Sequence, residues 1–252
     1  MKVIRDYQFL EISAKGASVA VGNFDGVHIG HQSVIDIARN KAIELRAPLG
    51  VLTFEPHPRS YFTPDASPFR LMSAEARETR LFKIGIDILY ELNFNSSLSS
   101  LTPREFAQNV ICNGLGLTNV AVGADFCFGK DRAGTVQDLL RFGEQMGFGV
   151  NIAPLVEAGL GEISSTSIRN ALSEGRPRNA ADQLGHWHRI EGPVIGGEQR
   201  GRELGYPTAN MSMDGLHLPK LGIYAVLVDI LDGPFKGSYH GAASLGVRPM
   251  FG

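Results

Sequence analysis

Strand-like and helix-like segments alternate through the first two-thirds of this chain, and this alternation limits the folds open to it. The strand-like segments are short apolar stretches at residues 19–22, 49–54, 86–92, 120–123 and 150–155. The helix-like segments between them are amphipathic stretches at residues 33–46, 74–83, 103–113 and 135–146. Strands that alternate with helices predict a parallel sheet covered by helices on both faces, which is an α/β fold.

The pattern of apolar and turn-forming residues changes in the last third of the sequence. Two short helix-like and two strand-like segments follow, at residues 169–173, 179–184, 223–230 and 242–245. From Ile190 onward, short apolar runs alternate with Gly and Pro, which predicts a small antiparallel β-barrel or part of one. We place the boundary near Gly185, so that residues 1–184 and 185–252 form two domains.

Composition and charge exclude several classes of protein. Of the 252 residues 43% are hydrophobic, and the net charge of -2 gives no broad attraction to nucleic acid or to a membrane surface. No apolar run is long enough to cross a bilayer. Because Cys112 and Cys127 form no metal or redox motif, we expect reduced thiols and a cytoplasmic location.

Three polar loops directly follow strands, at residues 23–31, 55–59 and 124–134. Ligands of parallel sheets bind beyond the carboxyl ends of the strands. We therefore expect these three loops to border one crevice.

The first loop carries the sequence Gly-Asn-Phe-Asp-Gly-Val-His-Ile-Gly-His at residues 22–31 and leads into a helix. Unpaired amides and the helix dipole make such a helix start an anion site, and Gly26 and Gly30 allow close backbone approach. His28 and His31 there predict donors to nucleotide phosphates. Surface histidines are one alternative. A zinc site is another, but Asp25 and His57 are the only nearby candidate ligands.

A second phosphate-binding pattern is Ile-Ser-Ser-Thr-Ser-Ile-Arg at residues 163–169. Capping of a helix would need only one of the hydroxyl residues Ser164 to Thr166. Several hydroxyls followed by Arg169 favour a phosphate clamp with charge-assisted hydrogen bonds. We expect Arg169 and His31 to hold opposite sides of one triphosphate.

Two further loops carry weaker signals. Phe126 and Phe128 are either core residues or rings that flank a planar ligand, with Asp125 as a hydrogen-bonding partner of that ligand. His57 lies between two prolines, either in a merely stiff loop or in contact with substrate or phosphate.

The third strong pattern is the glycine-rich stretch at residues 201–210. Thr208 and Asn210 would point to one side of an extended segment, and their oxygen atoms suit Mg²⁺ beside phosphates. Gly201 and Gly205 would let the backbone wrap a phosphate chain. The spacing is not that of a Walker P-loop.

The chain resembles a known family in motifs that span nearly its whole length. The motifs at residues 22–31, 54–58, 163–169 and 201–210 occur in this order in the bacterial bifunctional riboflavin kinase/FMN adenylyltransferases, or FAD synthetases. The resemblance implies a Rossmann-like nucleotidylyltransferase domain followed by a riboflavin kinase barrel. It implies that ATP phosphorylates riboflavin to FMN, that AMP passes from ATP to FMN to give FAD and pyrophosphate, and that both steps use Mg²⁺.

The resemblance also implies roles for residues at matching positions. The catalytic residues would be His28, His31 and Arg169. The nucleotide-binding residues would be Asn23, Gly26, Gly30, Ser165 and Thr166. Those near FMN would be His57, Asp125, Phe126 and Phe128. The kinase site would use Gly201 and Gly205 for phosphates, and Thr208 and Asn210 for the metal.

The family pattern continues beyond the last residue here, Gly252, with further strands and a glutamate that serves as general base in the kinase. The family also usually has Thr at the position of Met250. We therefore expect residues 185–252 to be the N-terminal portion of a kinase domain. An adenylyltransferase with a non-catalytic flavin- or nucleotide-binding C-terminal domain is the alternative.

Two rival functions start from the same residues. His-Ile-Gly-His at residues 28–31 also matches the ATP motif of class I aminoacyl-tRNA synthetases, but their lysine-rich second loop is replaced here by Ser-Ser-Thr-Ser-Ile-Arg. A flavin-nucleotide-binding protein without turnover is the non-enzymatic alternative.

Overall fold

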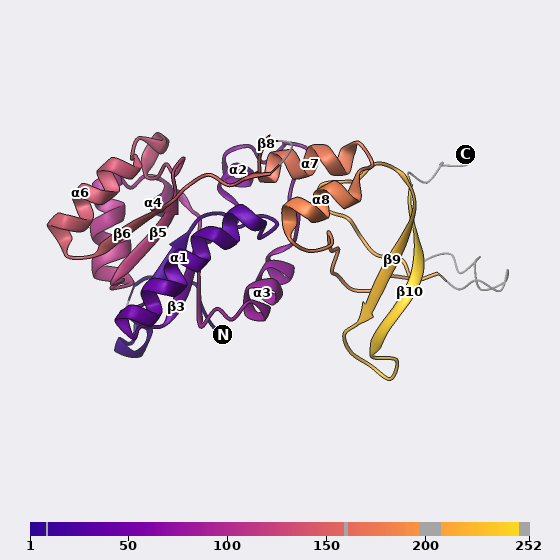
Figure 1. Cartoon of the computed structure of the whole chain (residues 1–252), viewed down its shortest axis with the longest axis horizontal. Helices are drawn as coiled ribbons and strands as arrows, with labels where there is room; N and C mark the ends of the chain where they lie inside the picture. Colours follow the sequence, from indigo (N-terminus) through magenta and orange to yellow (C-terminus); the bar gives the residue numbers. More distant parts are fainter. Residues whose placement is uncertain (9, 159–160, 197–207, 247–252) are drawn as a thin grey trace.

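Six parallel strands form the central sheet of this protein (Figure 1). The structure is a computed structural model that describes residues 1–8, 10–158, 161–196 and 208–246. The strand order is β1-β4-β3-β2-β5-β6. The strands are β1 (Lys2–Ile4), β2 (Ser18–Val21), β3 (Leu49–Glu55), β4 (Ile88–Asn93), β5 (Asn119–Gly123) and β6 (Gly149–Ala153). The expected parallel sheet is confirmed, and β1 is an edge strand that the sequence pattern did not reveal.

Helices cover both faces of this sheet because successive strand residues point to opposite sides. On β2, Val19 and Val21 face one apolar cluster and Ala20 faces the other. The first cluster takes its helical residues from 106–111, from the short helix that contains Leu98 and from α6 (Val136–Met146). The second takes its helical residues from α1 (Ile29–Leu45) and α3 (Ala74–Lys83).

The chain's local signals account for where these helices begin and end. Ser73 caps α3 by accepting a hydrogen bond from the Ala76 amide, and Thr135 forms a capping box at the start of α6. Gly147, with φ of 84°, ends α6 in the left-handed conformation. Short helices fill the loops: η1 (Ile12–Ala14), α2 (Pro58–Phe62), α4 (Ser96–Ser99) and η3 (Lys130–Arg132).

Several of the expected helices differ from the prediction in their bounds or their type. α1 begins at Ile29 rather than residue 33, because His28 already caps its first turn. The expected helix at residues 103–113 starts as α5 (Pro103–Glu105) and continues as the π-helix η2 (Phe106–Gly114).

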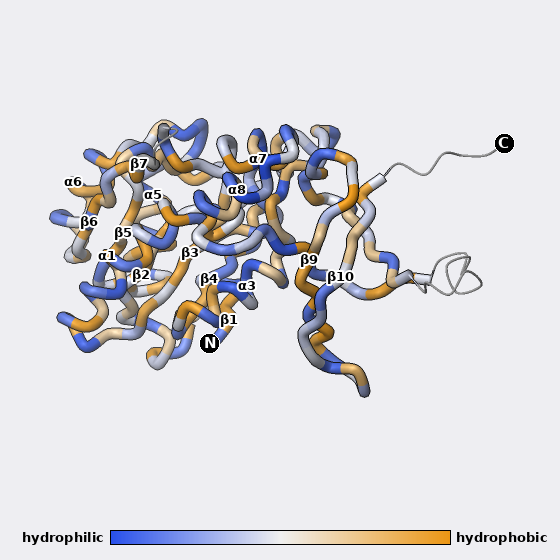
Figure 2. Tube along the Cα trace, turned by 45° about the vertical axis from the view of Figure 1, so that its right-hand side comes forward, coloured by the Kyte–Doolittle hydropathy of each residue, from blue (hydrophilic) through white to orange (hydrophobic). Residues whose placement is uncertain are grey.

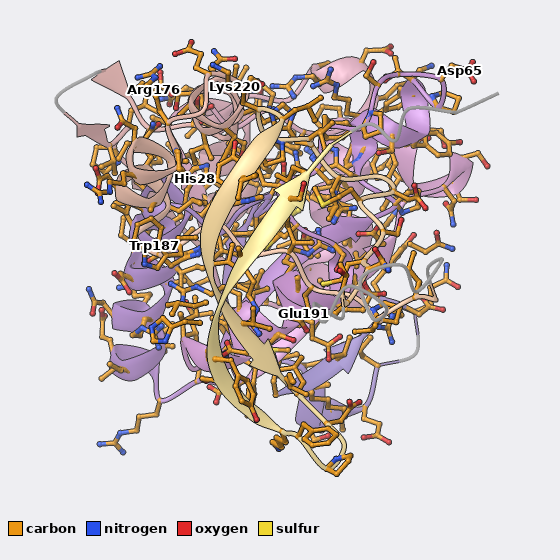
Figure 3. The ribbon with its side chains drawn as sticks, turned by 90° about the vertical axis from the view of Figure 1, so that its right-hand side faces the viewer. His28, Asp65, Arg176, Trp187, Glu191 and Lys220 are labelled. Carbon is orange, nitrogen blue, oxygen red and sulfur yellow. The ribbon has the colours of Figure 1, made fainter. Side chains whose placement is uncertain are left out.

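The last third of the chain packs at one end of the α/β body (Figure 1). α7 (Ser165–Ser173) and α8 (Pro177–Leu184) share a small apolar cluster with Leu71. β9 (Gly222–Ile230) and β10 (Gly237–Leu245) pair antiparallel, and Figure 3 shows them twisting around each other. In the described part of the predicted barrel, regular strand pairing consists of this ribbon and one bridge between Ile195 and Asn210.

Figure 2 shows that the ribbon of β9 and β10 stands apart from the α/β body along much of its length. Its apolar side chains are accordingly exposed, among them Ile223 at 82%, Leu227 at 67% and the neighbouring Phe235 at 72%. The short strands β7 (Glu157–Ala158) and β8 (Gly161–Glu162) pair antiparallel just before α7. No helix within the described residues has the length and apolar character needed to cross a membrane.

Candidate active site at the carboxyl ends of the strands

The start of α1 holds two stacked histidines. Nδ1 of His28 accepts a hydrogen bond from the backbone amide of His31 at 3.2 Å and so caps the helix. The two rings stack with their centroids 3.6 Å apart. Because Nδ1 of His28 is an acceptor, its Nε2 carries the proton of the neutral ring and is the available donor.

Burial keeps both rings uncharged near neutral pH. Burial, reinforced by the nearby Arg169, lowers the pKa of His28 to about 4. Burial and the neighbouring His28 lower the pKa of His31 well below its usual value. Without a ligand, the histidines therefore offer single N–H donors, and fixed positive charge comes from Arg169 and the helix starts. Nδ1 of His31 is buried without a hydrogen-bonding partner in the described structure.

The loop before α1 has an unusual backbone. Phe24 and Val27 have φ values of 52° and 44°, a conformation that is costly for a β-branched residue such as Val27. Gly26 has φ of 89°, and a Cβ atom added there would lie 2.8 Å from Cδ1 of Leu71. Such strain is typical of functional loops that the surrounding structure holds in place.

The start of α7 packs against this loop. Oγ of Ser165 donates a hydrogen bond to the backbone carbonyl of Asp25 at 2.9 Å. Nη1 of Arg169 pairs with Oδ2 of Asp25 at 3.1 Å, and its Nη2 donates to Oγ1 of Thr166. Ser164, rather than Ser165 or Thr166, forms the capping box of the helix. The hydroxyl–arginine cluster (residues 164–169) and the loop that carries the histidines (residues 22–31, the histidine loop) are distant in sequence but are thus neighbours in space.

Asp25 lies at the centre of this junction and is 2% exposed. Its Oδ1 accepts a hydrogen bond from the Leu71 amide at 2.8 Å, so each carboxylate oxygen has a donor. Burial raises the pKa of Asp25, against the opposing effects of the Leu71 amide, Arg70 and Arg169. Asp25 therefore fixes Arg169 beside the histidine loop.

His57 lies at the end of β3 among arginines. Its Nδ1 accepts a hydrogen bond from the Arg59 amide at 3.1 Å, and its ring meets that of Phe69 edge-on. Burial, together with Arg70, Arg77, Arg169 and Arg59, lowers its pKa to about 3. A neutral ring with Nδ1 as acceptor leaves Nε2–H as the donor.

The zinc alternative has little support in the geometry. Within the described residues, no three side chains of His, Cys, Asp or Glu are arranged to hold a metal ion. Asp25 is instead occupied by Arg169 and a backbone amide.

Ion pairs of the buried Arg77 hold the histidine loop against the sheet. Arg77 is fully buried and contacts Glu55 at 2.9 Å and Glu91 at 2.8 Å. It also donates to the Asn23 carbonyl at 3.3 Å, which ties the histidine loop to β3 and β4. Sequence reasoning missed this network, although Glu91 interrupts an apolar strand and was an available signal.

The arrangement of Phe126 and Phe128 differs from the ligand-flanking expectation. Their rings are nearly parallel with centroids 5.6 Å apart, whereas a planar ligand between them would require about 7 Å. Phe128 is 6% exposed and packs in the core with Phe106, which is the alternative reading of this residue. The two rings therefore do not enclose a ligand. In the loop after β5, Asp125 is exposed, whereas Phe126 is half-buried and packs against the core.

A surface aromatic group near His57 was missed. Tyr61 and Phe62 of α2 contact Phe94 edge-on, with ring centroids 5.3 Å and 5.7 Å apart, and Phe62 is 64% exposed. The available signal was the Tyr-Phe pair that follows Pro58, because proline favours the first turn of a helix.

The expected kinase residues are only partly described. Thr208 and Asn210 lie before β9, and the Asn210 carbonyl accepts a hydrogen bond from the Ile195 amide at 2.8 Å. Gly201 and Gly205 lie outside the described residues.

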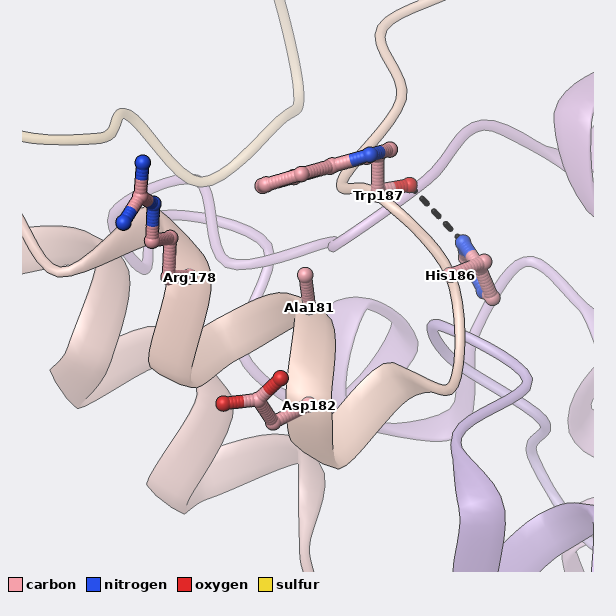
Figure 4. A pocket seen from close by; sticks show the side chains of 5 residues that line it. All are labelled: Arg178, Ala181, Asp182, His186 and Trp187. Atoms are coloured by element: carbon pink, nitrogen blue, oxygen red, sulfur yellow. Dashed lines mark hydrogen bonds between the residues drawn. The ribbon is translucent and has the colours of Figure 1, made fainter.

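A separate pocket of about 480 Å³ lies on α8 and the segment after it (Figure 4). It is lined by Arg178, Ala181, Asp182, His186 and Trp187. Nε2 of His186 also contacts the Gly26 carbonyl at 3.1 Å, so this segment touches the histidine loop.

Comparisons with known proteins agree with the order of the motifs. The family model for FAD synthetase matches residues 10–167, and that for riboflavin kinase matches residues 184–252. The chain is 41% identical over 249 residues to the bifunctional riboflavin kinase/FMN adenylyltransferase of Pseudomonas fluorescens, covering 99% of this chain and 78% of that protein. It is 33% identical over 251 residues to the protein of the same name from Escherichia coli, covering 99% of this chain and 79% of that one.

A solved structure has the same fold. It is described as a macrolide-efflux protein from Streptococcus pneumoniae, is 34% identical, and superposes with a TM-score of 0.82. The match covers 97% of this chain and 78% of that chain.

Proposed function

The chain belongs to the bifunctional riboflavin kinase/FMN adenylyltransferases, and we propose that it makes FAD by transferring AMP from ATP to FMN. Its C-terminal part belongs to the riboflavin kinase that phosphorylates riboflavin to FMN with ATP. The observation that carries the proposal is the contact of the His28–His31 loop with the Ser165–Arg169 turn through Asp25.

The triphosphate of ATP would lie between these two helix starts. Free amides of α1 and α7, the glycines Gly26 and Gly30, Asn23 and the hydroxyl of Thr166 would bind its oxygen atoms. Ser165 would contribute its backbone amide, because its one hydroxyl proton goes to the Asp25 carbonyl. Arg169 would add a charge-assisted hydrogen bond, and His28 and His31 would donate from neutral rings. Binding an anion there favours protonation of both rings, so their pKa values would rise on substrate binding.

The reaction is an in-line displacement that needs no covalent enzyme intermediate. A phosphate oxygen of FMN forms a bond to the α-phosphorus of ATP while the bond to the bridging oxygen breaks and pyrophosphate leaves. FMN is already a nucleophile near neutral pH because its second phosphate ionisation lies near 6. The chain's residues therefore position the reactants and stabilise negative charge on the leaving pyrophosphate.

FMN would bind at the ends of β3 and β5. His57 and Asp125 would supply polar contacts, and Phe126 would supply apolar contact with its exposed edge. Phe128 would act by supporting Phe126 from the core. The exposed ring of Phe62 offers an additional surface for the flavin ring system.

Mg²⁺ would neutralise phosphate charge in both steps when bound. Thr208 and Asn210 fit such a site for the kinase, since hydroxyl and amide oxygens suit Mg²⁺ when substrate phosphates complete its coordination. Gly201 and Gly205 would approach the phosphates. We assign residues 1–184 to the adenylyltransferase and 185–252 to the kinase, and the free Cys112 and Cys127 fit a cytoplasmic location.

The test compares wild type with His31→Ala. The protein is incubated with ATP, Mg²⁺ and FMN, and FAD and pyrophosphate are quantified by chromatography. Loss of one donor to developing charge typically costs about 100-fold in rate, so we expect at least that loss with an unchanged circular dichroism spectrum. His240→Ala, which removes an exposed histidine of β10, is the matched control and should form FAD like wild type.

The same assay separates the proposal from its rivals. Unchanged FAD formation by His31→Ala would refute the assigned role. Tight binding of FMN and ATP by wild type without pyrophosphate release would favour the non-enzymatic alternative. Pyrophosphate exchange that depends on an amino acid rather than on FMN would favour the aminoacyl-tRNA synthetase alternative.

A further inference from the structure

Arg59 is an exposed cation beside the proposed site, and the proposed reaction assigns it no role. It follows Pro58 in the first turn of α2, directly after the loop that carries His57. Its guanidinium lies 4.5 Å from the centre of the Phe69 ring. The guanidinium of Arg169 lies 5.8 Å from the centre of the same ring, so one phenylalanine positions both cations.

Arg59 differs from the other arginines of this region in its lack of a counter-charge. Arg70 pairs with Glu55, Arg77 with Glu55 and Glu91, and Arg169 with Asp25. Across the ranges that the structure describes, no carboxylate oxygen of an acidic side chain lies within 4.0 Å of a guanidinium nitrogen of Arg59. The side chain is exposed and its charge is therefore available to a ligand.

The two cations repel each other where they stand. The positive charge of Arg59 contributes to lowering the pKa of Arg169, after burial, which has the larger effect. It also contributes to lowering the pKa of His57. An anion between Arg59 and Arg169 would remove this repulsion and gain two charge-assisted hydrogen-bond donors.

We propose that Arg59 is a substrate-binding residue that, together with Arg169, binds a phosphate group of one of the two adenylyltransfer substrates. This inference rests on the proposed function and adds a cation to its site. The shared chemistry is a phosphate dianion, which either ATP or FMN can supply. Phe69 holds the two guanidinium groups so that both can reach the same anion.

A purely structural role for Arg59 makes a different prediction. If the residue only stacked on Phe69 to hold α2, its loss would lower stability and leave the Michaelis constants unchanged. If it binds phosphate, its loss raises the KM for one substrate and changes kcat less, because the contact exists before the transition state forms.

The experiment measures KM and kcat for FMN and for ATP separately, with wild type, Arg59→Gln and Arg59→Lys. We expect Arg59→Gln to raise the KM for one of the substrates by roughly tenfold, the effect of losing one charge-assisted contact. Arg59→Lys keeps the charge and should raise that KM less. The substrate whose KM responds identifies the source of the phosphate.

Arg141→Gln is the matched control. Arg141 also lies over a phenylalanine ring, with 5.3 Å between its guanidinium and the centre of Phe142, but it belongs to the exposed surface of α6. This variant should leave both KM values unchanged. Thermal unfolding of all variants separates folding defects from binding defects.

Two outcomes would overturn the inference while leaving the proposed function intact. One is an active Arg59→Gln whose two KM values stay within twofold of wild type. The other is an equal rise in Arg141→Gln. If wild type forms no FAD, the proposed function fails, and calorimetric titration of wild type and Arg59→Gln with ATP and with FMN still decides whether Arg59 binds phosphate.

Discussion

Replacing Asp25 by asparagine tests the junction between the histidine loop and α7 with almost no change in shape. Oδ1 of Asp25 accepts from the Leu71 amide at 2.8 Å, and Oδ2 accepts from Arg169 at 3.1 Å. Asparagine has one acceptor oxygen and an amide group that only donates. One of the two donors must therefore face another donor, and Arg169 loses its counter-charge.

The cost follows from burial. Breaking a buried ion pair from one side typically costs 3–5 kcal/mol. The Arg169 side chain is 16% exposed and can recover some hydration, so we expect Asp25→Asn to lower the free energy of unfolding by about 3 kcal/mol. We also expect FAD formation to slow by roughly tenfold or more because Arg169 is no longer fixed.

Urea unfolding followed by circular dichroism measures the first effect. Glu44→Gln is the control, because it breaks the exposed pair between Lys41 and Glu44 at 2.8 Å and should cost less than about 1 kcal/mol. A double-mutant cycle with Arg169→Met isolates the coupling between Asp25 and Arg169. If Asp25→Asn and Glu44→Gln unfold at the same urea concentration, the argument for this junction is wrong.

Two further predictions concern stability. Gly26→Ala should destabilise the protein by more than about 1 kcal/mol in urea unfolding, because φ is 89° and the new Cβ would lie 2.8 Å from Leu71. Gly215→Ala is the control, because Gly215 also has a positive φ of 76° but has open space around it. Equal losses of stability in the two variants would contradict the steric argument. Burial lowers the pKa of His188 to about 4. Between pH 6.5 and 4 the unfolded chain therefore binds more protons at this residue than the folded chain, and the free energy of unfolding decreases as the pH is lowered. Lowering the pH from 7 to 5.5 should cost about 1 kcal/mol through this residue, and thermal unfolding of His188→Gln should show a weaker pH dependence than wild type; an identical dependence would count against this prediction.

Local sequence signals predicted most of the α/β domain. The helix at residues 74–83 has the expected bounds, because its capping residue Ser73 and its apolar periodicity lie within one short segment. β1 was missed because three residues are too few to show a period. The π-helix was missed because its apolar pattern is close to that of an α-helix.

The candidate site shows the same limit more sharply. The sequence placed His28 and His31 at a helix start, but it could not show that burial makes them neutral. It singled out Arg169, but the pairing with Asp25 joins residues 144 positions apart. It could not distinguish core from ligand contact for Phe128, because that depends on Phe106 from another element.

Side chains from residues after 184 form hydrogen bonds with the backbone of residues before 184, and this affects any attempt to separate the two parts of the chain. His186 reaches the Gly26 carbonyl, His188 reaches the Leu71 carbonyl, and His217 reaches the Arg169 carbonyl. All three imidazoles come from beyond α8, yet they contact the backbone around the proposed nucleotide site. Cutting the chain after Leu184 would remove these three hydrogen bonds. An isolated N-terminal fragment should therefore be less stable and less active than the same residues within the whole protein.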